Sequence, residues 1–333
     1  MNRPIRAALR CMIATAWLAT ATLVHAAGAV GTTLPAGFPA IPDASLGTPL
    51  FGFGAAGPVT RTPVVFVHGN NDTPFATSCN PFYGNVHDFA QYLADQGYAP
   101  SELWAVGYQG DQCDLITDPT HRSGAAHTAA ANVPDVRAFV LAVLSYTGAK
   151  EVDIVAHSLG SVIVREWLRQ NPDDARHVRR FVAVDGANHG IINCSPNPLN
   201  YSQAPSLGGF VPSSAICQEL GSPNTPFLKR LNKGQEAPGP SADSLVIRNA
   251  DTGFVYFPTQ DGVLAGVPAE DSFGRPTDFS GSAKLRGVRE IDLTRQGVHD
   301  PILGTTHLGI LNSPDTWSAT LQFLTEHSHA RVR

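Results

Sequence analysis

The stretch Val152-Asp-Ile-Val-Ala-His-Ser-Leu-Gly160 indicates more about the fold than any other part of the chain. Residues 152–156 are typical of a buried strand, and the apolar spacing after Gly160 predicts a helix. Between them, Ala-His-Ser-Leu-Gly matches the pattern G-x-S-x-G, with Ala at the first position. In such a strand–turn–helix unit the serine lies in a sharp turn, and small flanking residues avoid a clash with the facing backbone. We therefore predict that Ser158 is a nucleophile rather than an ordinary helix cap.

Strands and helices alternate along the chain on both sides of this stretch. Apolar runs predict strands at 63–67, 103–106, 181–184, 245–247 and 288–293. Apolar residues at helical spacing predict helices near 86–93, 136–144, 163–168 and 314–324. Chains that alternate in this way form a doubly wound, mostly parallel sheet with helices on both faces. The sequence therefore predicts an α/β fold.

Two long stretches, at about 186–244 and 262–287, interrupt the alternation and are rich in Pro, Gly and Ser. Loops of this length inside a compact domain are usually functional. We expect residues 27–333 to form a single domain with insertions at these two places. The first insertion follows a strand, so it should lie at the same sheet edge as Ser158. Its apolar residues, Phe210 among them, predict a cap over the nucleophile; the alternative is that they only pack the insertion onto the body.

Composition excludes several classes of protein. The 333 residues are 43% hydrophobic and 15% charged, which is enough apolar material for a large core. The net charge is −5 and no Lys/Arg-rich run occurs, so nucleic acid is not an expected partner. The 31 Gly and 26 Pro exclude a coiled coil or a plain helix bundle. Apart from its first residues, the chain has no apolar run of ~18 residues, so no stable membrane insertion is expected.

Residues 1–26 have the features of a secretory signal peptide. Arg3, Arg6 and Arg10 precede an uncharged apolar segment that is too short to span a bilayer, and Val24-His-Ala26 resembles a cleavage site. We therefore expect a secreted, extracellular protein, with the periplasm as an alternative location. A membrane anchor is the competing interpretation of this segment.

Four cysteines remain after residue 26, namely Cys79, Cys113, Cys194 and Cys217. An even number in an exported chain predicts two disulfides. No C-x-x-C pair occurs, which argues against zinc, and we predict no metal site. Three connectivities are possible; we prefer Cys194–Cys217 with Cys79–Cys113, because each bond would close one long loop.

A nucleophilic serine requires a histidine base, and the base requires a carboxylate that orients it. His307 lies between the last predicted strand and the last predicted helix, where the base is expected when the chain order is Ser, acid, His. His299 is its main rival, since His327 and His329 follow the last helix.

Three aspartates are candidates for the orienting acid. Asp261 follows the strand that begins at Leu245 and is our preferred residue. Asp251 comes sooner after the same strand, although Asp-Thr-Gly is typical of a turn. Asp185, directly after the preceding strand, is the third possibility.

Backbone donors for an oxyanion are expected at two places. Val67-His-Gly-Asn70 ends the first buried strand, where Asn70 would supply one N–H group. Leu159, which follows the nucleophile, would supply the second.

These motifs together resemble a known family. Thr62-Pro-Val-Val-Phe-Val-His-Gly-Asn-Asn-Asp72, the Ser158 stretch and Gly186-Ala-Asn-His-Gly190 are similar to segments of the secreted bacterial class 2 lipases, and closer still to the lipase-like extracellular polyhydroxybutyrate depolymerases. The resemblance implies an α/β-hydrolase fold and a Ser-Asp-His triad that needs no cofactor. It covers roughly 62–328 in the order of elements, whereas its specific motifs cover about a tenth of that.

The expected activity is therefore that of a secreted serine carboxylic-ester hydrolase, with a lipase as the first choice and a lipid ester as the substrate. A polyester depolymerase is the alternative, although the chain ends soon after the last predicted helix and we expect no appended polymer-binding domain. A non-catalytic secreted binding protein on the same fold is the alternative from another class. It would be indicated by a missing triad residue, and candidates for all three are present.

Overall fold

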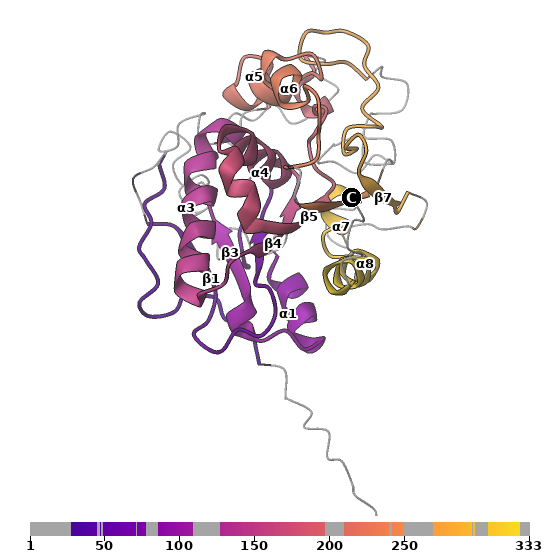
Figure 1. The fold of residues 1–333 in the computed structure, drawn as a ribbon. Helices are drawn as coiled ribbons and strands as arrows, with labels where there is room; N and C mark the ends of the chain where they lie inside the picture. The colour runs from indigo at the N-terminus through magenta and orange to yellow at the C-terminus, as the bar shows by residue number, and fades with distance from the viewer. Residues whose placement is uncertain are drawn as a thin grey trace, which may run out of the picture.

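A mixed but mostly parallel sheet forms the centre of the computed structural model (Figure 1). The structure describes residues 28–44, 47, 49–70, 72–77, 86–108, 127–196, 210–239, 242–249, 269–294, 296 and 306–326. Within these residues the sheet order is β1-β3-β2-β4-β5-β6-β7. The strands are β1 (Phe51–Phe53), β2 (Val64–Val67), β3 (Leu103–Gly107), β4 (Val152–His157), β5 (Val178–Val184), β6 (Asp243–Arg248) and β7 (Arg289–Asp292).

All neighbouring strands from β3 to β7 run parallel, and β1 pairs antiparallel with β3 at one edge. The sequence predicts five strands in addition to β4, and all five are present. The antiparallel edge strand was not predicted, because the Phe51-Gly-Phe53 pattern is too short to give a clear periodic signal. Gly52 in this strand passes close to the neighbouring backbone, and a Cβ there would lie 2.0 Å from the carbonyl oxygen of Ala105.

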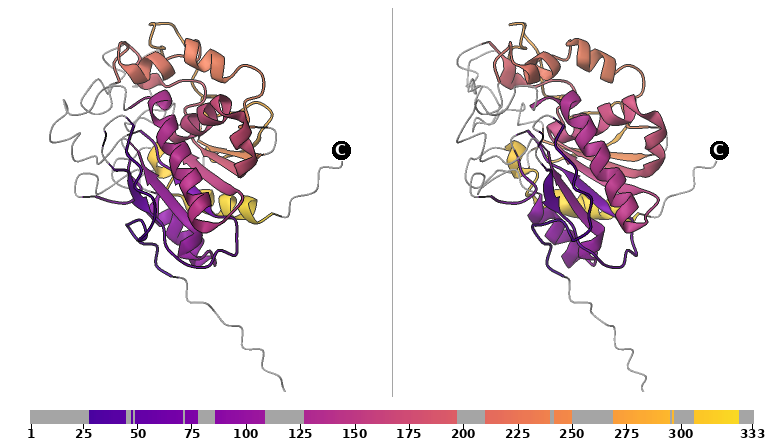
Figure 2. Two further views of the ribbon diagram at one scale, coloured as in Figure 1. Left: turned by 60° about the vertical axis from the view of Figure 1, so that its left-hand side comes forward. Right: turned by 90° about the vertical axis from the view of Figure 1, so that its left-hand side faces the viewer.

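Two layers of helices cover the sheet. Strand residues alternate between two hydrophobic clusters: Val65 and Val67 pack with α3 (Ala129–Thr147) and α4 (Leu159–Gln170), whereas Val64 and Phe66 pack with α1 (His87–Asp95) and α8 (Pro314–Thr325). The two views of Figure 2 show these helices on opposite faces of the strands. The remaining described helical elements are η1 (Pro100–Glu102), η3 (Pro172–His177), η4 (Ile192–Cys194), α5 (Ala215–Leu220), α6 (Pro226–Leu231) and α7 (Thr306–Gly309).

Local sequence fixes several helix ends. The Thr128 hydroxyl accepts a hydrogen bond from the backbone N–H of Ala131 at the start of α3, and Gly148 adopts a left-handed conformation at its end. Ser313 caps α8 by accepting a hydrogen bond from the N–H of Asp315, and Pro314 lies in the first turn. Helix α1 begins after Val86, which makes no side-chain cap hydrogen bond.

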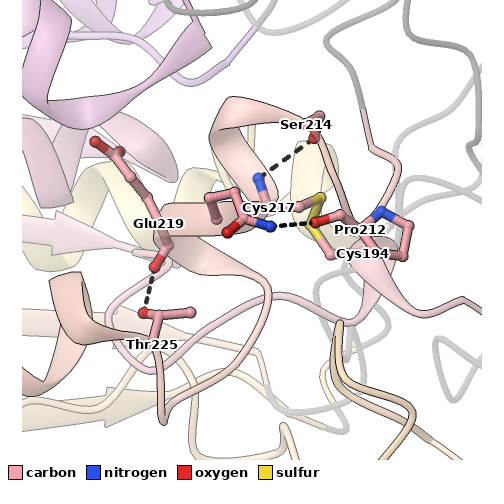
Figure 3. Close-up of a disulfide and its surroundings, with 7 residues drawn as sticks. Cys194, Pro212, Ser214, Cys217, Glu219 and Thr225 are labelled. Carbon is pink, nitrogen blue, oxygen red and sulfur yellow. Dashed lines mark hydrogen bonds between the residues drawn. A yellow bond between two sulfur atoms is a disulfide. The ribbon is translucent and has the colours of Figure 1, made fainter.

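The segment after β5 contains η4, α5 and α6, which lie together at one end of the sheet (Figure 1). A disulfide joins Cys194 in η4 to Cys217 in α5, with 5.5 Å between their Cα atoms (Figure 3). This bond confirms one half of the predicted pairing. Cys79, Cys113 and residues 1–26 lie outside the described residues, and so do residues 262–268 of the second insertion. Within the described part of the chain, no helix is both long and apolar enough to cross a bilayer.

Candidate active site

Ser158 occupies a strained turn at the carboxyl end of β4. Its φ of 52° and ψ of −122° are uncommon for a residue with a side chain, and α4 begins at the next residue. The backbone N–H of Ser158 donates to the carbonyl oxygen of Val184 at 3.1 Å, which holds the turn against β5. A Cβ on Gly160 would lie 2.5 Å from the carbonyl oxygens of both Val67 and His68. A larger residue there would displace the turn from β2, as the sequence pattern predicts.

His307 lies next to this serine. It belongs to α7, and the distance from its Nε2 to Ser158 Oγ is 2.9 Å. The imidazole is 2% exposed. Its predicted rival His299, like His327 and His329, lies outside the described residues. The structure thus brings together the serine and the histidine that the sequence selects, although they are 149 residues apart.

Asp185 occupies the other side of His307. One carboxylate oxygen, Oδ2, lies 2.6 Å from Nδ1 of His307, and the other, Oδ1, accepts from the N–H of Asn249 at 3.3 Å. The preferred acid of the sequence analysis, Asp261, lies outside the described residues, as does Asp251. Because Asp185 occupies the Nδ1 side of His307, this geometry favours Asp185, the third of the three candidates, over the preferred Asp261.

The pairing of β4 with β5 explains this position. The two strands are parallel, and His157 lies opposite Val184 in their register. Ser158 and Asp185 therefore leave the sheet side by side, each as the first residue after its strand. Asp185 has a φ of 47°, and its N–H donates to the carbonyl oxygen of Ile247 on β6 at 2.8 Å. A sharp turn thus directs its carboxylate toward His307.

Burial determines the charge state of the histidine. Desolvation lowers the pKa of His307 and the nearby His157 lowers it further, whereas the hydrogen bond that His307 donates to Asp185 opposes both effects. The net direction is downward from the ordinary value. The imidazole is therefore neutral at neutral pH and can accept a proton.

A second histidine, His157, contacts the backbone of His307. Its Nε2 lies 3.0 Å from the backbone carbonyl oxygen of His307, and its Nδ1 lies 3.3 Å from Asp72 Oδ2. The same Asp72 oxygen accepts from the N–H of Gly69 at 3.1 Å. The two imidazole rings lie 4.6 Å apart. The sequence analysis gave His157 no role, since nothing in one sequence indicates that the residue before the serine contacts a loop 150 residues later.

The predicted oxyanion residues lie beside the serine. Asn70 and Leu159 line the same pocket as Ser158 and His307. The side-chain oxygen of Asn70 contacts Nδ1 of His127 at 2.9 Å, which links the loop after β2 to the segment just before α3. His127 therefore has a structural contact at the site that the sequence did not indicate.

The pocket over Ser158 is small and largely apolar, with a cavity volume of about 10 Å³. Apart from the four residues already placed there, it is lined by Ala187, Ile191, Asn193, Phe210, Ile216 and Leu220. All six come from the segment that follows β5. Because the same segment packs into the main hydrophobic cluster, its apolar residues both cover the serine and hold the segment on the body.

Metal-ligating side chains do not gather anywhere in the described part of the chain in groups of three or more. The arrangement at Ser158 consists of a serine hydroxyl, an imidazole and a carboxylate in a line of hydrogen bonds, next to two candidate backbone donors. Such a set can transfer a proton from the hydroxyl to the imidazole and so create an oxygen nucleophile.

Comparison with known proteins identifies a family and several solved structures with a similar fold. The family model described as lipase (class 2) matches residues 61–256, more than half of the chain. The mature form of Bacillus licheniformis lipase BlEst2 superposes with a TM-score of 0.50 at 16% identity, over 83% of this chain and 98% of that one. Aspergillus fumigatus lipase B gives a TM-score of 0.46 at 16% identity, over 80% of this chain and 53% of the fungal one. This chain thus spans about half the length of the fungal enzyme.

Proposed function

Because the chain belongs to the class 2 lipase family, a family of carboxylic-ester hydrolases on the α/β-hydrolase fold, we propose that it hydrolyses acyl esters through Ser158, His307 and Asp185. The observation that carries the proposal is the unbroken contact from Ser158 Oγ to His307 Nε2 at 2.9 Å and from His307 Nδ1 to Asp185 at 2.6 Å.

The residues have distinct roles in the proposed reaction. His307 accepts the proton of Ser158 as Oγ attacks the ester carbonyl carbon, and Asp185 stabilises the imidazolium that forms. The N–H groups of Asn70 and Leu159 donate to the developing oxyanion. His307 then protonates the departing alcohol, and a water molecule, activated by the same imidazole, releases the acyl group from Ser158. None of these steps requires a cofactor.

A lipid ester is the proposed substrate class. Five of the six residues contributed to the pocket by the segment after β5 are apolar, which suits an acyl chain better than a charged group. A panel of p-nitrophenyl esters, triglycerides and polyhydroxybutyrate films would separate a lipase from a polyester depolymerase.

Export of the protein is also proposed. The cationic and then apolar residues 1–26 support it, and the Cys194–Cys217 disulfide is typical of an oxidising compartment. The intact mass of protein recovered from the culture medium should lack residues 1–26. Full-length chain retained in the cell membrane would contradict export.

The serine mechanism is tested by Ser158→Ala. We expect kcat for a soluble p-nitrophenyl ester to fall on the order of 10⁶-fold, since removing a triad nucleophile typically has this effect. The melting temperature should not fall, because the substitution removes only a hydroxyl group and shortens no buried chain. Activity within tenfold of the unchanged protein, in folded material, would exclude Ser158 as the nucleophile.

A further inference from the structure

Asn193 is a buried amide in the pocket over Ser158. It belongs to η4, its exposed fraction is 2%, and it lines the pocket together with Ser158 and His307. Neither its Nδ2 nor its Oδ1 forms a hydrogen bond with any residue that the structure describes. The triad does not use this side chain, and the sequence analysis did not single it out.

An amide in this position is unfavourable for the protein alone. The pocket residues contributed around it by the same segment, Ala187, Ile191, Phe210, Ile216 and Leu220, are all apolar. Burying a polar group without a partner costs about 1–3 kcal/mol. A leucine has nearly the same shape and would avoid this cost. The amide is therefore better explained by a group that enters the pocket than by packing of the protein itself.

The backbone around Asn193 is held in place. The next residue, Cys194, forms the disulfide with Cys217, whose helix supplies Ile216 and Leu220 to the same pocket. The N–H of Ser195 donates to the carbonyl oxygen of Ile192 at 2.9 Å, which closes the turn. Because the disulfide and this hydrogen bond hold the turn, a ligand could reach the amide without a conformational change of η4.

We propose that Asn193 is a specificity residue that selects esters carrying a hydroxyl or carbonyl oxygen near the scissile bond. This inference rests on the proposed function. Nδ2 can donate to either kind of oxygen, and Oδ1 can accept from a hydroxyl, so a hydroxyl satisfies both atoms. A site with buried hydrogen-bonding groups discriminates against a substrate that leaves them unpaired. An unsubstituted alkyl ester would leave the Asn193 amide unpaired, and it should be the poorer substrate.

The experiment compares matched pairs of esters. Methyl β-hydroxybutanoate against methyl butanoate places the extra hydroxyl on the acyl side, and β-hydroxyethyl butanoate against ethyl butanoate places it on the alcohol side. We expect kcat/KM to favour the hydroxylated member of at least one pair. In Asn193→Leu, and in Asn193→Ala if the leucine variant does not fold, that ratio should fall about tenfold or more, the effect of one lost hydrogen bond. Ile216→Val is the control: it changes the shape of the pocket but no hydrogen bond, so it should leave the ratio of the pair unchanged.

Two results would overturn the inference. One is that the protein without substitutions has the same kcat/KM for both members of each pair. The other is an Asn193 variant that slows both members of a pair equally, which would indicate a structural role. Failure of the proposed function has a different signature, because the unchanged protein would then hydrolyse none of the four esters. In that case ester binding to Ser158→Ala, measured as a shift in melting temperature, still tests the inference. A hydroxylated ester should stabilise Ser158→Ala, and this shift should be lost in the double variant Ser158→Ala with Asn193→Leu. Equal shifts in the single and the double variant would overturn the inference.

Discussion

Ser158 and Asp185 share an unusual backbone conformation. Among the described residues other than glycine, these two have positive φ angles, 52° and 47°. Such conformations cost on the order of 1–3 kcal/mol each and persist where the surrounding structure holds them. Here the N–H of each residue donates to a carbonyl oxygen of the neighbouring strand, Val184 for Ser158 and Ile247 for Asp185. The strain therefore falls on two residues whose side chains must both reach His307.

Substitution of Asp185 tests its proposed role as the orienting acid. Asp185→Asn should lower kcat by on the order of 10⁴, because an amide no longer selects the imidazole tautomer that accepts the serine proton. Asp261→Asn, made in the same way, is the matched control and should change kcat little. Steady-state kinetics on one soluble ester suffices for the comparison. The reverse ranking would return the role to Asp261.

At the scale of elements, the pocket depends on how η4 and α5 are joined. The Cys194–Cys217 disulfide connects them across 23 residues of sequence. In α5, Ser214 caps the helix by accepting from the N–H of Cys217, and the Thr225 hydroxyl bonds to the carbonyl oxygen of Glu219 at 2.6 Å (Figure 3). The segment that follows β5 and covers Ser158 is therefore held by one covalent bond and by local hydrogen bonds.

Removal of this disulfide should destabilise the segment that follows β5 while leaving Ser158, His307 and Asp185 in place. For Cys194→Ala with Cys217→Ala, we expect a loss of about 3 kcal/mol in the free energy of unfolding, as for other loops of similar length. Thermal or urea unfolding measures it. The addition of a reductant is the control, since it should destabilise the unchanged protein more than the variant. Equal unfolding midpoints for the two proteins under oxidising conditions would show that the bond does not stabilise this segment.

At the scale of the whole molecule, three carboxyl groups are held in surroundings that disfavour their charge. Burial raises the pKa of Asp135 to about 7, of Asp153 to about 6 and of Glu219 to about 7. Asp153 is paired with Arg179, with 2.9 Å from Nε to Oδ1, and yet burial has the larger effect on its pKa. Asp135 accepts from the N–H of Ala44 at 2.8 Å and so links α3 to the segment before β1.

Because of these three groups, we expect the free energy of unfolding to fall as pH rises from about 4 to 7. Between their ordinary values, 3.8 to 4.5, and their raised values, the folded chain binds more protons than the unfolded chain, so the free energy of unfolding decreases with pH. The lowered pKa of His307 has the opposite effect on the free energy of unfolding. The substitution Asp135→Asn isolates the contribution of one carboxyl group. Asp135→Asn cannot ionise, and it should reduce the fall in melting temperature by at least about 2–4 °C, the shift expected for about 1 kcal/mol.

Asp88→Asn provides the control for this measurement, because the Asp88 side chain is 71% exposed. Its melting temperature should follow that of the unchanged protein across the same pH range. If Asp135→Asn also follows the unchanged protein, the ionisation of Asp135 does not contribute to the pH dependence of stability.

The sequence by itself determined the fold class, and it selected the serine and the histidine that the structure places in contact. Alternating periodicities specify strands and helices locally, and the pattern from Val152 to Gly160 specifies the turn because only small residues fit between β4 and β2. His307 could be found because its place, between the last strand and the last helix, is a matter of chain order. One disulfide pair, Cys194–Cys217, was also chosen correctly.

Only the tertiary structure decided which groups meet. Asp185 reaches His307 because β4 and β5 are parallel neighbours in a register that ends both strands at one level, and a sequence does not state which strands are neighbours. The same holds for His157 beneath His307 and for Asn193 in the pocket, whose positions depend on loops that approach from distant parts of the chain. Local patterns follow from local sterics and solvent exposure, whereas the partners of a buried polar group are set by packing across the whole sheet.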